Sequence, residues 1–426
     1  MRRRLFIALL GVLLGALLAP DLAHAESGRT FKAELKLQSM YVDVPSDSLS
    51  QALGVGSHWD NALNLRVMGN GQLGSGWSWD AAWVLGARRG EGVELDRRLY
   101  EYDPALYAPA EDRNWWDLQH SFTDKGRTYA AHSMDRLALA YSGAHAVLRL
   151  GRQALTWGGG LVFHPMDLFN PFAPNAIDTE YKPGADMLYG QWLFDSGADI
   201  QGVIAPRRDP LTRRVETDQS AAGLKWHGFI GAEQQNGLEL MLARDHDSDV
   251  LGLALNGTLG GATWTAEAVP TRLSDGSLHS SWLADIQYAW TCLGRNCIGY
   301  AEVFRNGFGV RGSNYTLADL PEPLTERLAR GELFTVSRDY LALGLKLEWT
   351  ALLNIKPLLV TNLDDGSALL VVQVVRSLSD TAKLTLAAQS GLGPRGTEYG
   401  GLETTADSGV YVAPLRYLYA RIDWYF

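Results

Sequence analysis

The sequence predicts an all-β fold: a closed, antiparallel transmembrane β-barrel of about eighteen strands, with sixteen as the alternative count. Three observations lead to this prediction. Apolar and polar residues alternate in many short segments, long and short connections between these segments follow each other in turn, and the last segment ends on an aromatic residue. A barrel strand needs such alternation because its side chains face the bilayer and the interior in turn.

The first 25 residues predict an export signal. Arg2–Arg4 are positively charged, Leu5–Leu18 are apolar, and Ala23–Ala25 form a small-x-small cleavage site. We expect cleavage after Ala25, which leaves residues 26–426 for the barrel. No other stretch approaches 18 uninterrupted apolar residues, so a helical membrane protein is not expected.

The alternation is clearest in the last segment, Leu415–Phe426. Phe426, Trp424 and Ile422 share one face, while Asp423 and Arg421 lie on the other. The same period recurs from the start of the chain, for example in Phe31–Gln38, Leu63–Val67, Trp77–Leu85 and Leu341–Trp349. The segment of about ten residues matches the length of a strand that crosses a bilayer.

The connections between segments separate into two sets. The odd-numbered connections, which include nearly all the long ones, are Val42–Asp60, Ala87–Ser133, Leu155–Ala185, Pro206–Ser220, Arg244–Asp249, Thr271–Ser281, Gly307–Ser337, Asn362–Gly366 and Gly391–Pro414. The even-numbered ones are short turns: Gly69–Gly76, Tyr141–Ala144, Asp195–Gly197, Gly231–Gly237, Leu259–Gly261, Cys292–Cys297, Thr350–Asn354 and Leu378–Asp380. Outer-membrane barrels place long loops outside and short turns in the periplasm, and both chain ends inside require an even number of strands.

Two of the short turns carry further signals. Cys292 and Cys297 are the only cysteines of an exported chain, so we expect a disulfide across that turn rather than a metal site. Gly69–Gly74 matches the glycine pattern of dinucleotide-binding loops, but the residues after it alternate like a strand where that motif needs a helix. Nucleotide binding is therefore not expected.

The segments place equal numbers of opposite charges on their inward faces. The nine cations are Lys32, Lys36, Arg66, Arg149, Lys225, Lys346, Lys356, Lys383 and Arg421, and the nine anions are Glu34, Asp80, Asp199, Glu239, Glu267, Asp285, Glu302, Glu348 and Asp423. A pore for one sign of charge would carry the opposite sign in excess. The balance argues against a polyanion channel and favours pairing between the two sets. The net charge of −10 also argues against nucleic acid as a partner.

The third long connection, Leu155–Ala185, differs from the others because it is long, apolar and rich in proline. In water it would form a large apolar patch, so we expect it to fold into the barrel and narrow the interior. It then acts as packing, as a partner-docking surface, or as a slide for an amphipathic substrate. The candidate path residues are Arg149, Arg152, Trp157, Phe163, His164, Asp167, Phe169 and Phe172.

Several of these features resemble known families. The final strand ending in Phe426 resembles the closing strand of Gram-negative outer-membrane barrels, where the terminal aromatic residue is an assembly signal. The stretch from Leu150 to Pro171 resembles uncharacterised bacterial outer-membrane barrels, and porins use their third loop as a constriction. The whole chain resembles eighteen-stranded substrate-selective porins and alginate-export-type channels, although it lacks the basic interior expected for alginate. The resemblance implies the outer membrane as location, with its lipid and the barrel-assembly machinery as partners.

These features together predict a channel for a small or amphipathic solute, without a bound cofactor or metal. One alternative is a non-conducting scaffold that partners a periplasmic lipid carrier or an electron-transfer protein. Another is a lipid hydrolase or acyltransferase that uses His145 or His227. The sequence contains no Gly-x-Ser-x-Gly, His-Glu-x-x-His or Cys-x-x-Cys-His motif, so no catalytic residue is assigned and an enzyme is not expected.

Overall fold

Eighteen antiparallel strands form one closed ring in the computed structural model, which describes residues 29–104, 107–231 and 236–426. The strands of the ring are β1 (Arg29–Asp43), β2 (His58–Gly74), β3 (Trp77–Arg89), β5 (Thr128–Ser142), β6 (Ala146–Gln153), β7 (Ala185–Leu193), β8 (Asp199–Arg208), β9 (Val215–Ile230), β10 (Asn236–Asp245), β11 (Ser248–Leu259), β12 (Ala262–Arg272), β13 (Leu278–Cys292), β14 (Arg295–Arg305), β15 (Asp339–Thr350), β16 (Leu353–Asn362), β17 (Ala368–Ser379), β18 (Ala382–Leu392) and β21 (Arg416–Tyr425).

The ring closes between the first and last strands. β1 pairs with β21 from Glu34↔Tyr425 to Asp43↔Arg416, and the backbones of Ala33 and Phe426 exchange two hydrogen bonds. Every other strand of the ring pairs with its successor along the chain. The predicted fold class and strand count are therefore confirmed. The predicted export signal, residues 1–25, lies outside the described residues.

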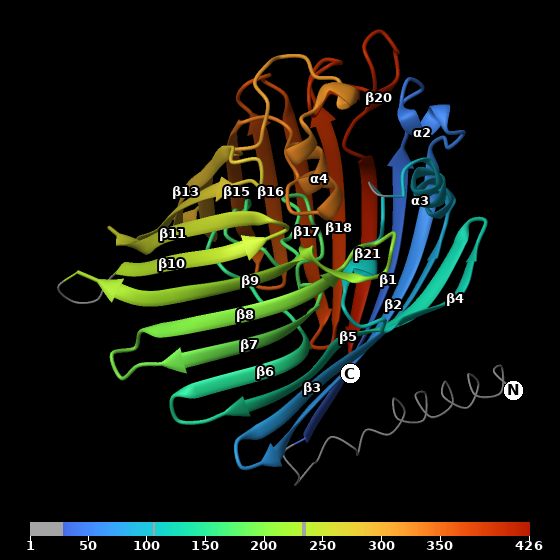
Figure 1. The fold of residues 1–426 in the computed structure, drawn as a ribbon. Helices are drawn as coiled ribbons and strands as arrows, with labels where there is room; N and C mark the ends of the chain where they lie inside the picture. Colours follow the sequence, from blue (N-terminus) through green and yellow to red (C-terminus); the bar gives the residue numbers. More distant parts are fainter. Residues whose placement is uncertain (1–28, 105–106, 232–235) are drawn as a thin grey trace, which may run out of the picture.

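The long connections all leave the wall at one end of the barrel, and the short turns lie at the other end (Figure 1). The long connections contain the remaining elements: α2 (Leu49–Ala52), α3 (Glu91–Tyr102), η2 (Ala110–Arg113), β4 (Gln119–Lys125), η3 (Leu317–Asp319), α4 (Glu322–Arg330), β19 (Leu402–Glu403) and β20 (Tyr411–Val412). β4 pairs only with β5 and stays outside the ring. The predicted sorting of connections is confirmed, and so is the even strand count.

The first short turn is tighter than the sequence predicts. Gly69–Gly74 belongs to β2, and only Ser75 and Gly76 connect it to β3. The glycines of this stretch therefore form ladder pairs, such as Gly69↔Ala81, and no helix follows them. At another short turn the structure joins Cys292 and Cys297 by a disulfide, between the ends of β13 and β14.

The two faces of the wall differ as a bilayer requires. On β10, Leu240 and Leu242 are 47% and 61% exposed on the outer face, whereas Met241 between them is 2% exposed on the inner face. Large apolar side chains are exposed in this way around the ring, at a cost in water of roughly 2 kcal/mol for each leucine. Surrounding acyl chains remove this cost, so the wall is a transmembrane surface. Among the described residues, no helix is long and apolar enough to cross a membrane.

Candidate functional site

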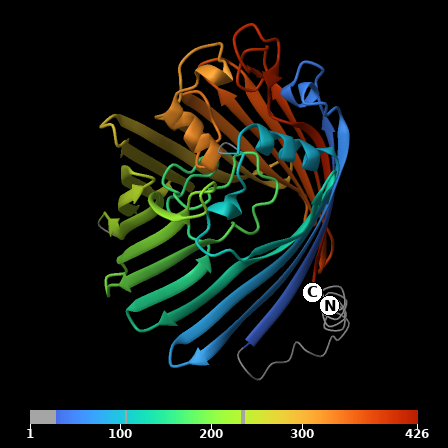
Figure 2. The same ribbon diagram turned by 45° about the vertical axis from the view of Figure 1, so that its right-hand side comes forward.

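Residues 154–184, called the inner loop below, leave the wall after β6 and return at β7. Figure 2 shows this green segment inside the ring of strands. Its contacts reach distant parts of the wall: Gly159 N–H donates to Glu267 on β12 at 2.5 Å, and Asn175 Nδ2 donates to Gln389 on β18 at 3.0 Å. The inner loop therefore crosses the interior from one side to the other.

The first half of the inner loop is held by acidic side chains of the wall. Glu302 on β14 accepts hydrogen bonds from the backbone N–H groups of Leu161 and Phe163, both at 2.7 Å, and from that of Val162 at 3.2 Å. The chain must bend sharply to present these groups. At Gly160 a Cβ would lie 2.0 Å from the carbonyl oxygen of Phe163 and 2.7 Å from Leu283, so only glycine fits.

Three of the predicted aromatic path residues pack against the wall in this half. Trp157, 1% exposed, contacts Phe169 edge-on at 5.6 Å, and both pack on inward-facing residues of β7 to β12. Phe163 stacks on Phe304 of β14 with 4.4 Å between the ring centres. These three side chains hold the inner loop in place and leave Phe172, which is only partly buried, to face open space.

The last part of the inner loop is acidic and meets a basic area where β1, β2, β18 and β21 lie side by side. Asp178 pairs with Lys36 at 2.8 Å and with Arg421 at 2.9 Å. Glu180 pairs with Lys36 at 3.5 Å and with Lys383 at 3.6 Å. Burial acts to raise the pKa of Asp178, but Lys36 and Arg421 outweigh it and the pKa is lowered.

The predicted lumen charges also pair among themselves: Arg421 with Asp423 at 2.7 Å, and Lys346 with Glu348 at 2.9 Å. The opposite charges are thus not mixed evenly. Glu267 and Glu302 bind the backbone of the inner loop, and the cations near the closing strands bind its carboxylates. This arrangement fixes both the position and the direction of the loop.

Arg152 and Asp167, two of the predicted polar path residues, are engaged in buried ion pairs. Arg152 is 3% exposed and binds Asp186 through two hydrogen bonds of 2.8 and 2.9 Å. It also donates to the backbone carbonyl of Trp116 at 2.6 Å. Asp167 pairs with Lys182 within the inner loop. Burial raises the pKa of Asp167 to about 6, although Lys182 opposes the shift.

Arg149 and His164 have different surroundings. Arg149 lies opposite Tyr189 on the inward face of β6 and is exposed. His164 lies in the inner loop, where burial lowers its pKa to about 4, so its imidazole is neutral at pH 7. His164 also lines an open space between the inner loop and the wall.

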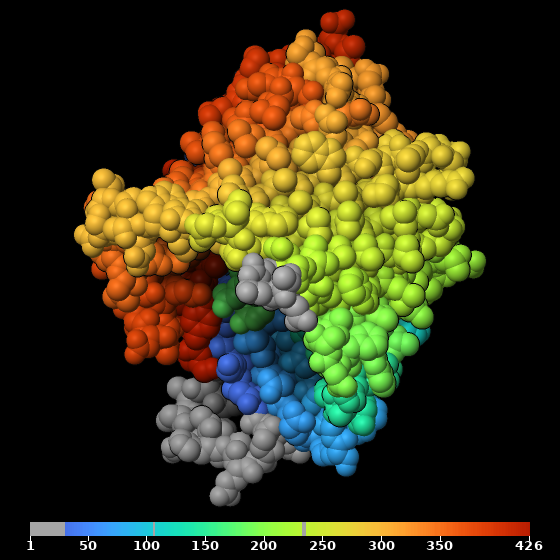
Figure 3. Space-filling view, turned by 90° about the vertical axis from the view of Figure 1, so that its left-hand side faces the viewer, coloured from blue at the N-terminus to red at the C-terminus, as the bar shows by residue number. Residues whose placement is uncertain are grey.

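A chamber of about 310 Å³ lies between the inner loop and the wall. Its loop side includes His164, Phe172 and Ile177, and its wall side is formed by Tyr300 on β14, Lys356 and Leu358 on β16, and Val371 and Gln373 on β17. Two smaller spaces, of about 20 and 60 Å³, are lined both by His164 and by Leu333 in the long connection after β14. Figure 3 shows that the molecule is hollowed between the orange-to-red strands and the green ones.

The sequence placed Lys356 among the inward charges but did not single out Tyr300, Lys356 or Gln373 as chamber residues. Alternation assigns them to the inward face, because Tyr300 shares that face with Glu302, and Lys356 with Leu358. Which inward residues face open space depends on the course of the inner loop. That course follows from contacts across more than a hundred residues, such as that between Gly159 and Glu267.

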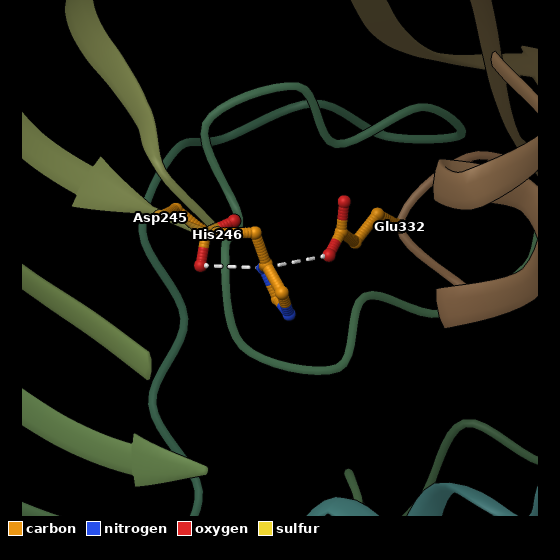
Figure 4. A group of neighbouring side chains, drawn as sticks. All are labelled: Asp245, His246 and Glu332. Carbon is orange, nitrogen blue, oxygen red and sulfur yellow. Dashed lines mark ion pairs between the residues drawn. The ribbon is translucent and has the colours of Figure 1, made fainter. Parts of the chain in front are cut away.

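Asp245, His246 and Glu332 form a cluster near the outer end of the barrel (Figure 4). The Nδ1 atom of His246 lies 3.2 Å from an oxygen of each carboxylate. Side chains of these types bind transition metals. Here Arg207 and Arg330 donate to the same two carboxylate oxygens, each at 2.7 Å, so arginines already supply the positive charge. Arg207 also donates to the carbonyl of Leu168, which ties the cluster to the inner loop.

No family model and no curated protein matches the chain. Among solved structures, OccK5 (OpdH) of Pseudomonas aeruginosa is similar, with a TM-score of 0.54 and 8% identity over 93% of this chain and 98% of that one. OccAB1 of Acinetobacter baumannii gives a TM-score of 0.52 and 8% identity over 95% and 99% of the two chains. At such low identity the likeness concerns the fold. The chain therefore shares the closed β-barrel fold of these two proteins over nearly its whole length.

Proposed function

We propose that the protein is a bacterial outer-membrane channel that passes a small or amphipathic solute through its interior. The observation that carries the proposal is the inner loop: it crosses the interior, is fixed on both sides, and leaves a chamber of about 310 Å³ beside it. A loop that only filled the barrel would have no need of an open, partly polar chamber.

The character of the interior supports transport rather than catalysis. Most of the inward-facing charges are engaged in ion pairs or in binding the inner loop, as Lys36, Lys346 and Glu302 are. The chamber lining mixes apolar groups with amide, hydroxyl and ammonium groups. An eighteen-stranded barrel is wide enough for an aqueous passage, which a loop can then narrow. The fold shared with OccK5 and OccAB1 agrees with an outer-membrane barrel.

Conductance in planar lipid bilayers tests this proposal. We expect the purified protein to give discrete current steps, and larger ones when residues 157–174 are deleted. The deletion variant should also carry Glu267→Gln and Glu302→Gln, because it would otherwise leave two buried carboxylates without their partners.

A matched control shortens residues 404–410, which connect β19 and β20 outside the barrel. We expect this variant to conduct like the unchanged protein. A folded barrel that stays silent both intact and without its inner loop would contradict the proposal and favour the scaffold. Hydrolysis of phospholipid by the purified protein would favour the enzyme.

A further inference from the structure

We infer that the chamber is a binding site for a small molecule with an apolar body and one negatively charged end, and that Lys356 contacts that end. The inference rests on the proposed function and names the class of solute that the channel selects. It follows from three properties of the chamber: its apolar walls, its single full charge and its size.

Apolar groups face each other across the chamber. Phe172, Pro174 and Ile177 of the inner loop lie on one side, and Leu358 and Val371 on the other. The inner loop cannot easily withdraw, because Phe163 is stacked on Phe304 and Asp178 is paired with Lys36. These walls are therefore preformed, so an apolar body gains from leaving water without first having to order the protein.

Lys356 is the only lining residue with a full charge at neutral pH, since His164 is neutral there. Within the described part of the chain, its ammonium group has no hydrogen bond or ion pair, and the charges that act on it are those of Lys346 and Lys383. Those two lysines are paired with Glu348 and Glu180. Lys356 therefore lacks the anionic partner that Lys346 and Lys383 both have, and a bound anion would supply one.

Tyr300 adds a rigid wall next to this cation. Its ring lies across Gly344 of the neighbouring strand, where a Cβ would meet the ring at 2.0 Å. Gln373 does not compete for the charged end of a ligand, because its Nε2 donates to the carbonyl of Ile177 at 3.2 Å. The ammonium group of Lys356 is thus the charged donor of the chamber that is available to an anion.

The volume limits the size of the ligand. A cavity of roughly 150 Å³ holds one benzene ring, so about 310 Å³ has room for one ring with a short charged chain. A folded sugar polymer or a lipid with two acyl chains does not fit. Phenylacetate is therefore a suitable probe, with phenylacetamide and phenethylammonium as its neutral and cationic counterparts.

Binding of these probes to the full-length barrel in detergent tests the inference by isothermal titration calorimetry. We expect phenylacetate to bind more tightly than the other two probes, and Lys356→Gln to weaken its binding about tenfold. Binding of phenylacetamide should change less than twofold in the same variant. Lys356→Glu should make phenethylammonium the preferred probe.

Lys346→Gln is the matched control, because Lys346 lies on the neighbouring strand and is paired with Glu348. Equal losses in the two glutamine variants would overturn the inference, because they would indicate the general field of the interior rather than a site at Lys356. The inference would also be overturned if all three probes bound equally well, or if no probe bound at all. If the protein conducts but phenylacetate does not block the current, the channel proposal holds and the binding site at Lys356 is contradicted. If the protein binds phenylacetate but does not conduct, the binding site holds and the channel proposal is contradicted.

Discussion

The backbone N–H of Phe163 donates to the carboxylate of Glu302 at 2.7 Å, although 139 residues separate them in the chain. This bond joins the apolar bend of the inner loop to the inner face of β14. With the adjacent bonds from Leu161 and Val162, it makes one carboxylate the anchor of three consecutive residues.

Replacing this anchor with an amide should loosen the inner loop. In Glu302→Gln an NH₂ group replaces one acceptor oxygen and faces backbone N–H groups, at a cost of roughly 2 kcal/mol. Hydrogen exchange of the amides of residues 161–163 should then be about thirtyfold faster. Glu348→Gln, which removes a carboxylate paired with Lys346, should leave these amides unchanged.

Two neighbouring glycines should differ sharply in their tolerance of alanine. Gly160→Ala places a Cβ 2.0 Å from the carbonyl oxygen of Phe163, so the bend cannot form as it stands. Gly159→Ala places it 3.4 Å from Thr265, which is an ordinary contact. We expect protease cleavage within the inner loop of the first variant only, with both barrels still resisting unfolding in detergent at room temperature. Equal cleavage of both variants would contradict the bend described here.

Glu398, in the connection after β18, should make the outer end less stable as pH rises. It accepts hydrogen bonds from Val336 N–H at 2.9 Å and from Asn362 at 2.8 Å, yet burial raises its pKa from 4.5 to about 7. The folded chain then binds this proton more tightly than the unfolded chain does. Its contribution to stability is fully present below pH 4.5 and is lost as pH rises through 7.

Urea unfolding followed by tryptophan fluorescence at pH 5 and pH 8 measures this effect. The part of the difference due to Glu398 should be at most about 3 kcal/mol and should vanish in Glu398→Gln. Glu322→Gln, at an exposed position on α4, should keep the pH dependence of the unchanged protein. A Glu398→Gln variant with that same dependence would show that other groups cause it.

The disulfide between Cys292 and Cys297 should matter little to the barrel. It closes a loop with a sequence separation of only five residues, so the unfolded chain loses little freedom through it. Replacing both cysteines with serine should lower stability by about 2 kcal/mol or less. Transition midpoints in urea, compared with and without reductant for both proteins, measure this difference. A larger loss would mean that the bond holds more than the turn between β13 and β14.

The sequence by itself determined the ring. Period-two alternation identifies the strands, since each side chain must face either acyl chains or the interior, and the sorting of connections then sets an even count. Local pattern is sufficient here because strands that follow one another along the chain also pair with one another. Leu240, Met241 and Leu242 were assignable to a face from their order alone.

Only the tertiary structure decided the site. Arg152 and Asp167 are polar residues in an apolar stretch, as a binding residue would be, but Asp186 and Lys182 pair with them. In the sequence, Lys356 is only one of nine inward cations. The course of the inner loop decides that Lys356 faces the chamber without a partner. That course depends on contacts such as that between Phe163 and Glu302, which join residues far apart in the sequence and leave no periodic trace in it.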